Sequence, residues 1–180
     1  MNLYKQHYNN TVSKDLTSRF VYLNCNQISK LEKLSINLGI KEFNLKKNLT
    51  NILLLEFISS NPAILTKAKK NIILLNIKKN SPNGLKLNLK KNHAYNFFQK
   101  LGLYVFPNFK TNKIFLKLKK TNSISFSIKE IDSFQELTFF YNFFKNSNCI
   151  DINFKINGFF YKTSHELIFF LTSFKFPIFL

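Results

Sequence analysis

The stretch Ile150-Asp-Ile-Asn-Phe-Lys-Ile-Asn157 alternates strictly between apolar and polar residues. A period of two is typical of a β-strand that buries one face and leaves the other in water. The same alternation recurs in Lys33–Gly39, Leu85–Lys90 and Ser123–Ile128, and Lys113–Lys119 is a further strand candidate. Strands of this kind usually form an antiparallel sheet that is covered on one side only.

Segments with helical spacing lie between these strands. The predicted helices are Leu3–Phe20, Lys46–Ser59, His93–Tyr104, Ser133–Phe144 and Thr163–Phe174. The last two open with Ser133-Phe-Gln-Glu136 and Thr163-Ser-His-Glu166, which resemble capping boxes. Within Lys46–Ser59, apolar residues recur at helix spacing around Leu49, Leu53 and Phe57. Phe97, Phe98 and Leu101 lie on one side of the helix His93–Tyr104.

This order of elements predicts an α+β fold with a mainly antiparallel sheet and helices packed on one face. Residues 1–180 contain no repeat and no linker, so a single domain is expected.

The chain is strongly basic, with a formal net charge of +18. Lysine carries almost all of it, because Arg19 is the single arginine. A charge of this size favours a polyanionic partner. The abundance of Lys, Asn, Ile and Phe matches what AT-rich codons encode, so part of the bias belongs to the genome.

The two cysteines, Cys25 and Cys149, form no CxxC pair, so no zinc site is expected. Buried free thiols are favoured over a disulfide. The most apolar stretches, Ile72–Ile77 and Leu167–Phe174, fall far short of the ~20 residues of a membrane-spanning helix. Met1–Phe20 has neither a secretory nor a transit pattern, which predicts synthesis in the compartment where the protein works.

The wet faces of the predicted strands carry Lys, Asn and Ser with almost no acid. Lysines neutralise phosphates, and amides and hydroxyls reach 2′-OH groups and base edges, so this open face is predicted to bind RNA. The alternative is a solvated sheet face in a protein rich in Lys and Asn.

A hairpin over Lys69–Lys91 is the second candidate for a functional element. Its loop, Lys78–Gly84, ends in Pro82-Asn83-Gly84, which is turn chemistry. Such a basic tip could touch RNA, although a solvated surface loop fits the same pattern.

No catalytic set emerges, because His7, His93 and His165 lie in three separate helical segments and the acids are scattered. No nucleotide-binding glycine loop, nucleophile elbow or HExxH motif is present, so neither an enzyme nor a cofactor is expected.

Six stretches, in order, resemble the bacterial-type large-subunit ribosomal protein L five family. They are His7–Phe20, Leu31–Gly39, Leu65-Thr-Lys-Ala-Lys-Lys70, Gly84–Leu89, Tyr95–Leu101 followed by Pro107, and Phe174-Lys-Phe-Pro177. The resemblance implies a structural protein of the central protuberance whose open sheet face binds ribosomal RNA, either 5S RNA or large-subunit RNA. It also implies contact with the P-site tRNA through the hairpin tip, and with neighbouring ribosomal proteins that include a small-subunit head protein.

The candidate residues divide into two groups. The RNA-binding group is Lys33, Asn37, Asn61, Thr66, Lys67, Lys69, Lys70, Lys86, Asn88 and Lys90. The tRNA-contact group is Lys78, Lys79, Asn80, Ser81 and Asn83.

Two other functions remain open at this point. A free RNA-binding factor for assembly or splicing would share the basic face, and a peripheral membrane protein would use Lys and Phe. The expected location is the mitochondrion, with a plastid or the cytoplasm of an AT-rich bacterium as alternatives.

Overall fold

The computed structural model describes residues 2–40, 44–75, 77–108, 117–118, 123–129, 131–145, 147–157 and 164–176. The chain forms two compact units. The first unit comprises Met1–Leu34, Leu89–Phe126 and Asn153–Leu180, and the second comprises Ser35–Asn88 and Ser127–Ile152. The expectation of a single domain over residues 1–180 stays a prediction.

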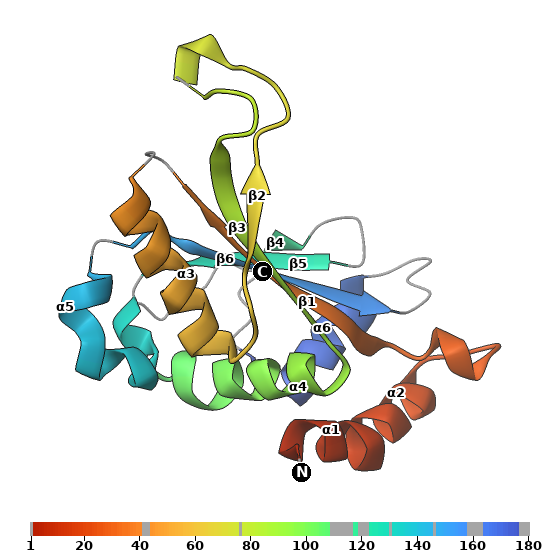
Figure 1. The fold of residues 1–180 in the computed structure, drawn as a ribbon. Helices are drawn as coiled ribbons and strands as arrows, with labels where there is room; N and C mark the ends of the chain where they lie inside the picture. Colours follow the sequence, from red (N-terminus) through yellow and green to blue (C-terminus); the bar gives the residue numbers. More distant parts are fainter. Residues whose placement is uncertain are drawn as a thin grey trace. The chain divides into compact units, whose positions relative to one another are not determined.

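Helices and strands follow one another in the predicted order (Figure 1). The α-helices are α1 (Leu3–His7), α2 (Ser13–Arg19), α3 (Leu45–Ser59), α4 (Lys91–Lys100), α5 (Tyr141–Phe144) and α6 (Ser164–Ser173). The strands are β1 (Lys30–Gly39), β2 (Ile64–Lys67), β3 (Pro82–Lys90), β4 (Lys117–Leu118), β5 (Ser123–Ile128) and β6 (Ile150–Asn157). Short π-helical or 3-10 turns extend several of these elements: η1 (Tyr8–Val12), η2 (Cys25–Gln27), η3 (Ile73–Leu75), η4 (Leu101–Val105), η5 (Ile131–Ser133) and η6 (Gln135–Phe140).

The strands form one sheet in the order β2-β3-β1-β6-β5-β4, and the α+β class with a mainly antiparallel sheet is confirmed. Burial alternates along the strands as predicted. The apolar residues of β3, β5 and β6 are buried, while their polar neighbours are exposed or half-buried. One side of these strands therefore faces a core and the other stays open.

An aromatic cluster forms the core of the first unit. Phe98 of α4 is fully buried, and its ring lies 4.4 Å from that of Phe176 and 5.4 Å from that of Phe154. Phe97 and Leu101, predicted to lie on the same side of this helix, are also buried. The first pair is stacked and the second meets edge to face, and both arrangements stabilise the cluster beyond simple area burial.

A buried carboxylate fixes the segment that leads into β1 in the same unit. Glu166 of α6 accepts hydrogen bonds from the Tyr22 hydroxyl at 2.6 Å and from the Ser29 hydroxyl. Burial, with the bond to Glu166 as a second cause, raises the pKa of Tyr22. The carboxylate of Glu166 thus has hydrogen-bond partners, without which its burial would be unfavourable.

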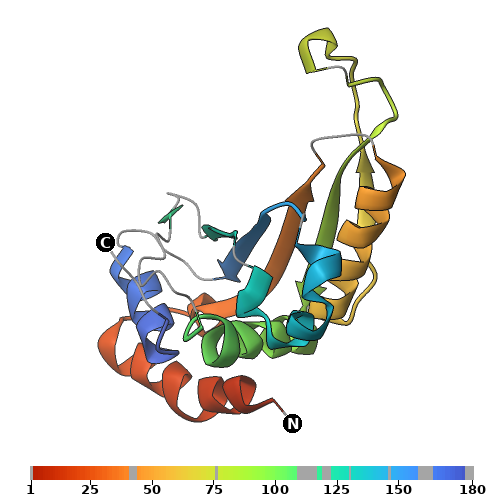
Figure 2. The same cartoon turned by 90° about the vertical axis from the view of Figure 1, so that its left-hand side faces the viewer.

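In the second unit, α3 runs beside β2 and β3 (Figure 2). The predicted helix is confirmed, but the side that carries its regularly spaced apolar residues is exposed. Leu49, Leu53 and Phe57 are 61%, 47% and 48% exposed. The buried side consists instead of Asn48, Asn51, Leu54, Leu55 and Ile58. Leu54 and Leu55 follow Leu53 directly, so the run of leucines allows two helical faces and the spacing alone selects the wrong one.

One other local prediction is wrong, and two lie wholly or mostly outside the described residues. The capping box at Ser133 is wrong, because η6 follows Phe134, which makes no side-chain cap bond, and Ser133 itself belongs to the preceding turn η5. Thr163 lies outside the described residues. So does most of the strand candidate Lys113–Lys119, of which only Lys117–Leu118 is described, as β4.

Candidate RNA interface

Strands β2 and β3 form the base of a hairpin in the second unit. They pair antiparallel with Ile64 opposite Lys86 and Thr66 opposite Gly84. The Thr66 hydroxyl donates to the Gly84 carbonyl oxygen at 2.9 Å. A Cβ atom on Gly84 would lie 3.1 Å from the Leu38 carbonyl oxygen and 3.2 Å from Thr66 Oγ1. Glycine therefore permits the close approach of three strands here, and the Thr66 hydroxyl helps to hold the hairpin.

The open side of β3 carries the clearest candidates for RNA contact. Lys86 and Asn88 are exposed, while Leu85 and Leu87 between and beside them are buried. On the adjacent strand β1, Asn37 is half-buried. In the first unit, Lys33 is half-buried and Lys90 is exposed. These residues lie on the polar side of their strands, as the alternation predicted.

An apolar residue shares this surface with the lysines, and sequence reasoning missed it. Ile64 is 61% exposed and lies directly opposite Lys86. Directly paired residues point to the same side of a sheet. The signal was available, because Ile64 stands two positions before Thr66 and must share its face.

The hairpin continues beyond the sheet, and its apex differs from the prediction. The Ala68 amide donates a hydrogen bond to the Ser81 carbonyl oxygen, and the Ala68 carbonyl oxygen accepts one from the Asn80 amide. Further from the sheet, Ile72 and Ile77 exchange backbone hydrogen bonds. The turn η3 (Ile73–Leu75) follows at the apex (Figure 1). The predicted loop Lys78–Gly84 is thus part of the returning arm, and Pro82–Gly84 lie in β3.

The positive φ of this arm is found at Asn80, with φ 68°, and not at Gly84. The Ser81 hydroxyl donates to the Lys78 carbonyl oxygen at 2.6 Å, and the Lys79 amide donates to Asn71 Oδ1 at 2.5 Å. These bonds give the arm a defined turn before it enters β3.

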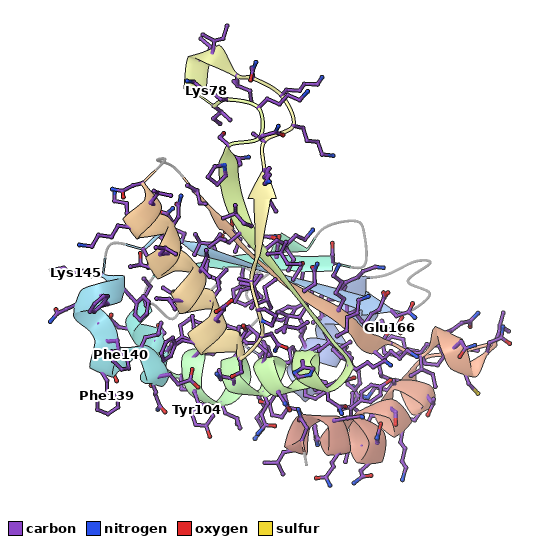
Figure 3. The ribbon with its side chains drawn as sticks, in the orientation of Figure 1. Lys78, Tyr104, Phe139, Phe140, Lys145 and Glu166 are labelled. Atoms are coloured by element: carbon purple, nitrogen blue, oxygen red, sulfur yellow. The ribbon has the colours of Figure 1, made fainter. Side chains whose placement is uncertain are left out.

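Five exposed lysines line the two arms: Lys67, Lys69, Lys70, Lys78 and Lys79. Figure 3 shows Lys78 on the projecting part of the hairpin, away from the sheet. At the apex, Ile73 and Leu74 are 89% and 95% exposed. The hairpin is therefore a basic stem with an apolar tip, and sequence reasoning identified the stem but missed the tip. The run Ile72–Leu75 was the available signal, since it interrupts the lysines without any alternation.

Two predicted contact residues are partly occupied by local bonds. Asn61, half-buried in the turn after α3, donates from Nδ2 to the Ser59 carbonyl oxygen at 2.8 Å. Asn83 is exposed, and its carbonyl oxygen accepts from the Ile40 amide at 3.1 Å.

Acids on the polar side of the strands have basic or hydroxyl partners. In the first unit, Glu32 Oε2 lies 2.9 Å from Lys155 Nζ. In the second unit, Asp151 accepts a hydrogen bond from the Ser127 hydroxyl. The exposed pair contributes little to stability, and the charges of Glu32 and Lys155 largely cancel each other.

Within the described ranges, no group of three or more His, Cys, Asp or Glu side chains could hold a metal ion. Nor does any helix there have the length and hydropathy to cross a membrane. Cys25 and Cys149 are free, as favoured, but both are exposed, so the expectation that they are buried is wrong. Cys25 lies between the exposed Asn24 and Asn26, and Cys149 precedes β6, whose buried residues begin at Ile150.

The fold and this surface define a basic α+β protein whose sheet is open on one side and extended by a lysine-rich hairpin. No family model matches the chain. It is 31% identical to the large ribosomal subunit protein uL5m of Reclinomonas americana, over 99% of this chain and 98% of that protein. It is also 31% identical to uL5 of Wolbachia pipientis subsp. Culex pipiens, over 98% and 99% of the two chains. A shorter match, 37% identical, covers 57% of this chain and 58% of uL5 of Thermosipho africanus.

The chain therefore belongs to the uL5 family of large ribosomal subunit proteins. The resemblance noted in its sequence is confirmed, and the protein is a structural ribosomal component and not an enzyme.

Proposed function

We propose that this protein binds ribosomal RNA of the central protuberance, 5S RNA or large-subunit RNA, through the open side of β1 and β3. The observation that supports the proposal is the placement of Lys86 and Asn88, both exposed and both on the polar side of a strand whose other side is buried. Lysine supplies charge to phosphates, while the amide can bond a 2′-OH group or a base edge. An RNA strand that lies flat on β1 and β3 would contact both the lysine and the amide.

The hairpin extends this proposal to tRNA. Its stem carries five exposed lysines, of which all but Lys67 lie beyond the strands of the sheet, so it can reach a second nucleic acid while the sheet stays bound to the first. The partner proposed for it is the P-site tRNA. Contact with a small-subunit head protein and with neighbouring ribosomal proteins completes the proposed set of partners.

The proposed place of action is the mitochondrial ribosome, with residues 1–180 as one ribosomal domain. The support is the full-length likeness to a uL5m protein, at 31% identity.

The first experiment measures the affinity of the chain for transcripts of 5S RNA and of a central-protuberance fragment at several salt concentrations. Lys86→Ala should weaken binding and reduce the slope of log K against log salt by about one unit, because one phosphate contact is lost. Lys14→Ala, which removes an exposed lysine of α2, is the control and should leave the slope unchanged. Equal slopes for the two variants would refute a phosphate contact at Lys86.

The second experiment addresses the hairpin. The double variant Lys78→Glu/Lys79→Glu should still enter large subunits but should lower tRNA occupancy of the P site, because like charges repel the tRNA backbone. Sedimentation of the subunits and filter binding of P-site tRNA give the two readouts. Loss of assembled subunits would contradict a role confined to tRNA.

A further inference from the structure

Helix α3 exposes a continuous apolar row in the second unit. Leu45, Leu49, Leu53 and Phe57 are spaced four residues apart and are 70%, 61%, 47% and 48% exposed. Residues at this spacing lie above one another on one side of a helix. The row runs from Leu45 to Phe57, thirteen residues or roughly 18 Å of helix.

The opposite side of the same helix buries polar groups. Asn48 and Asn51 are only 5% and 3% exposed. Neither atom of the Asn48 amide, nor Oδ1 of Asn51, has a hydrogen-bond partner among the described residues. Burial of an unbonded amide is unfavourable by about 1–3 kcal/mol. If the apolar row faced water in the working protein, a helix that buried its leucines and exposed its asparagines would be more stable. We therefore expect the apolar row to be covered in the working protein.

The apolar row continues onto neighbouring elements of the same unit. The Phe57 ring lies 5.7 Å from that of Phe140 and 6.3 Å from that of Phe144. Phe139 and Phe143, on η6 and α5, are 91% and 72% exposed. Figure 3 shows Phe139 below the ribbon of these elements, with Lys145 at their opposite end. We call this set of residues, Leu45, Leu49, Leu53, Phe57, Phe139, Phe140 and Phe143, the α3 surface.

The positive charge at the first turn of α3 indicates which kind of partner fits the α3 surface. The first turn of α3 contains Lys46 and no acid, so a lysine adds to the positive end of the helix dipole. The described acid of α3, Glu56, is near the other end, where its Oε1 accepts from the Ala63 amide at 3.1 Å. A carboxylate from a partner would complement the first turn.

We propose that the α3 surface docks an amphipathic helix of a neighbouring ribosomal protein, with acidic residues beside the first turn of α3. The proposal rests on the function proposed above, because it places the neighbour within the large subunit. A row spaced by four residues forms the ridge that packs into the groove of another helix. RNA phosphates gain nothing from a row of leucines, and a second copy would bring another +18 of charge to the contact.

The test replaces the row in the full chain and follows the composition of assembled subunits. Leu49→Asp/Leu53→Asp removes leucines that are 61% and 47% exposed. The matched control, Leu3→Asp/Leu103→Asp, removes helical leucines that are 61% and 46% exposed elsewhere. Both variants change the net charge equally, so a difference between them reports on position.

Large subunits that carry each variant are purified by sedimentation, and their proteins are quantified by mass spectrometry. In the Leu49/Leu53 variant, the chain should remain present while one neighbouring protein falls at least about tenfold, a loss that corresponds to 1.4 kcal/mol. The control should retain every protein. A full protein complement in the Leu49/Leu53 variant would overturn the inference.

Cross-linking identifies the occupant without relying on a variant that must fold. A benzophenone amino acid at position 53 of the chain, irradiated in intact subunits, should link to one protein at a peptide with helically spaced apolar residues and acids. Links to RNA, to lipid, to a second copy, or to no partner would each refute the proposal. If the unmodified chain is absent from large subunits, the proposed function fails; if it is present and these links are missing, only the docking inference fails.

Discussion

In α3, the effect of an asparagine side chain on stability depends on its position along the helix. Asn44 lies at the start of the helix, where its Oδ1 accepts from the Lys46 amide at 3.1 Å. Asn48, one turn later, is buried with an unbonded amide. An amide at a helix start satisfies a backbone donor, whereas the same amide in a core loses its water.

These two asparagines should respond in opposite directions to the same change. Asn48→Leu has nearly the same shape and should raise the free energy of unfolding by about 1 kcal/mol, because an unbonded buried amide is replaced by an apolar group. Asn44→Leu should lower it by about 1 kcal/mol, because the cap is lost. Urea denaturation of both variants measures the effects. A destabilised Asn48→Leu protein would indicate that water or a partner bonds this amide.

A buried phenol gives the first unit a dependence on alkaline pH. Burial, with the nearby Tyr8 as a second cause, raises the pKa of Tyr95. Its contribution to stability is fully present below about pH 10, where the phenol is neutral in both states. As the pH rises further, only the unfolded state ionises, so stability is lost by up to about 1.4 kcal/mol per pH unit.

Tyr95→Phe should therefore flatten the loss of stability above pH 10. At pH 7 the variant should be less stable than the wild type by about 1 kcal/mol, because the hydroxyl loses its bond to the backbone of Leu31. Thermal unfolding at pH 7, 10 and 11 gives the comparison. A constant difference at all three values would exclude Tyr95 as the source.

The elements of this fold divide into those that a local pattern determines and those that need tertiary information. Strands β3, β5 and β6 were predictable. Strict alternation places Leu87, Phe126 and Phe154 each on the apolar side of its own strand, and that side is buried. The inward side of α3 was not predictable, since the run Leu53-Leu-Leu55 supports two faces. What packs on each face is a property of the other elements.

The same division holds for the candidate RNA interface. Lys86 and Asn88 were predictable from alternation, and their exposure agrees. The course of the hairpin was not, because Asn83-Gly84 has turn composition but serves the close contact of β3 with Thr66 and Leu38. A glycine required for packing and a glycine required for a positive φ look alike in a sequence.

The hairpin turn itself can be tested at Asn80, which has φ 68°. Asn80→Gly should leave stability within about 0.5 kcal/mol, whereas Asn80→Ala should lower it by about 1 kcal/mol, because a Cβ is strained in this region. Hydrogen exchange of the Ala68 and Ser81 amides measures the effect locally. Equal protection in the two variants would place the strain elsewhere.

At the scale of the whole molecule, the charge of +18 makes the free chain and the bound chain different in stability. Self-repulsion opposes the compact state, and RNA removes it. A 5S or central-protuberance transcript at 100 times its dissociation constant should raise the free energy of unfolding by about 2.7 kcal/mol. Thermal unfolding with and without RNA measures this gain.

Salt separates this effect from non-specific stabilisation. The gain from RNA should shrink as salt rises, because counterion release drives the binding. The free chain should become more stable over the same range, because salt screens its own repulsion. A gain that is independent of salt would contradict an interface built on lysine.

Cys25 lies in the first unit and Cys149 in the second, and both thiols are exposed and unpaired. The protein thus carries a native pair of attachment points for fluorescent dyes or spin labels, one in each unit. Distance measurements between the two labels would follow the separation of the two units during ribosome assembly, and no residue of the chain would need to be substituted.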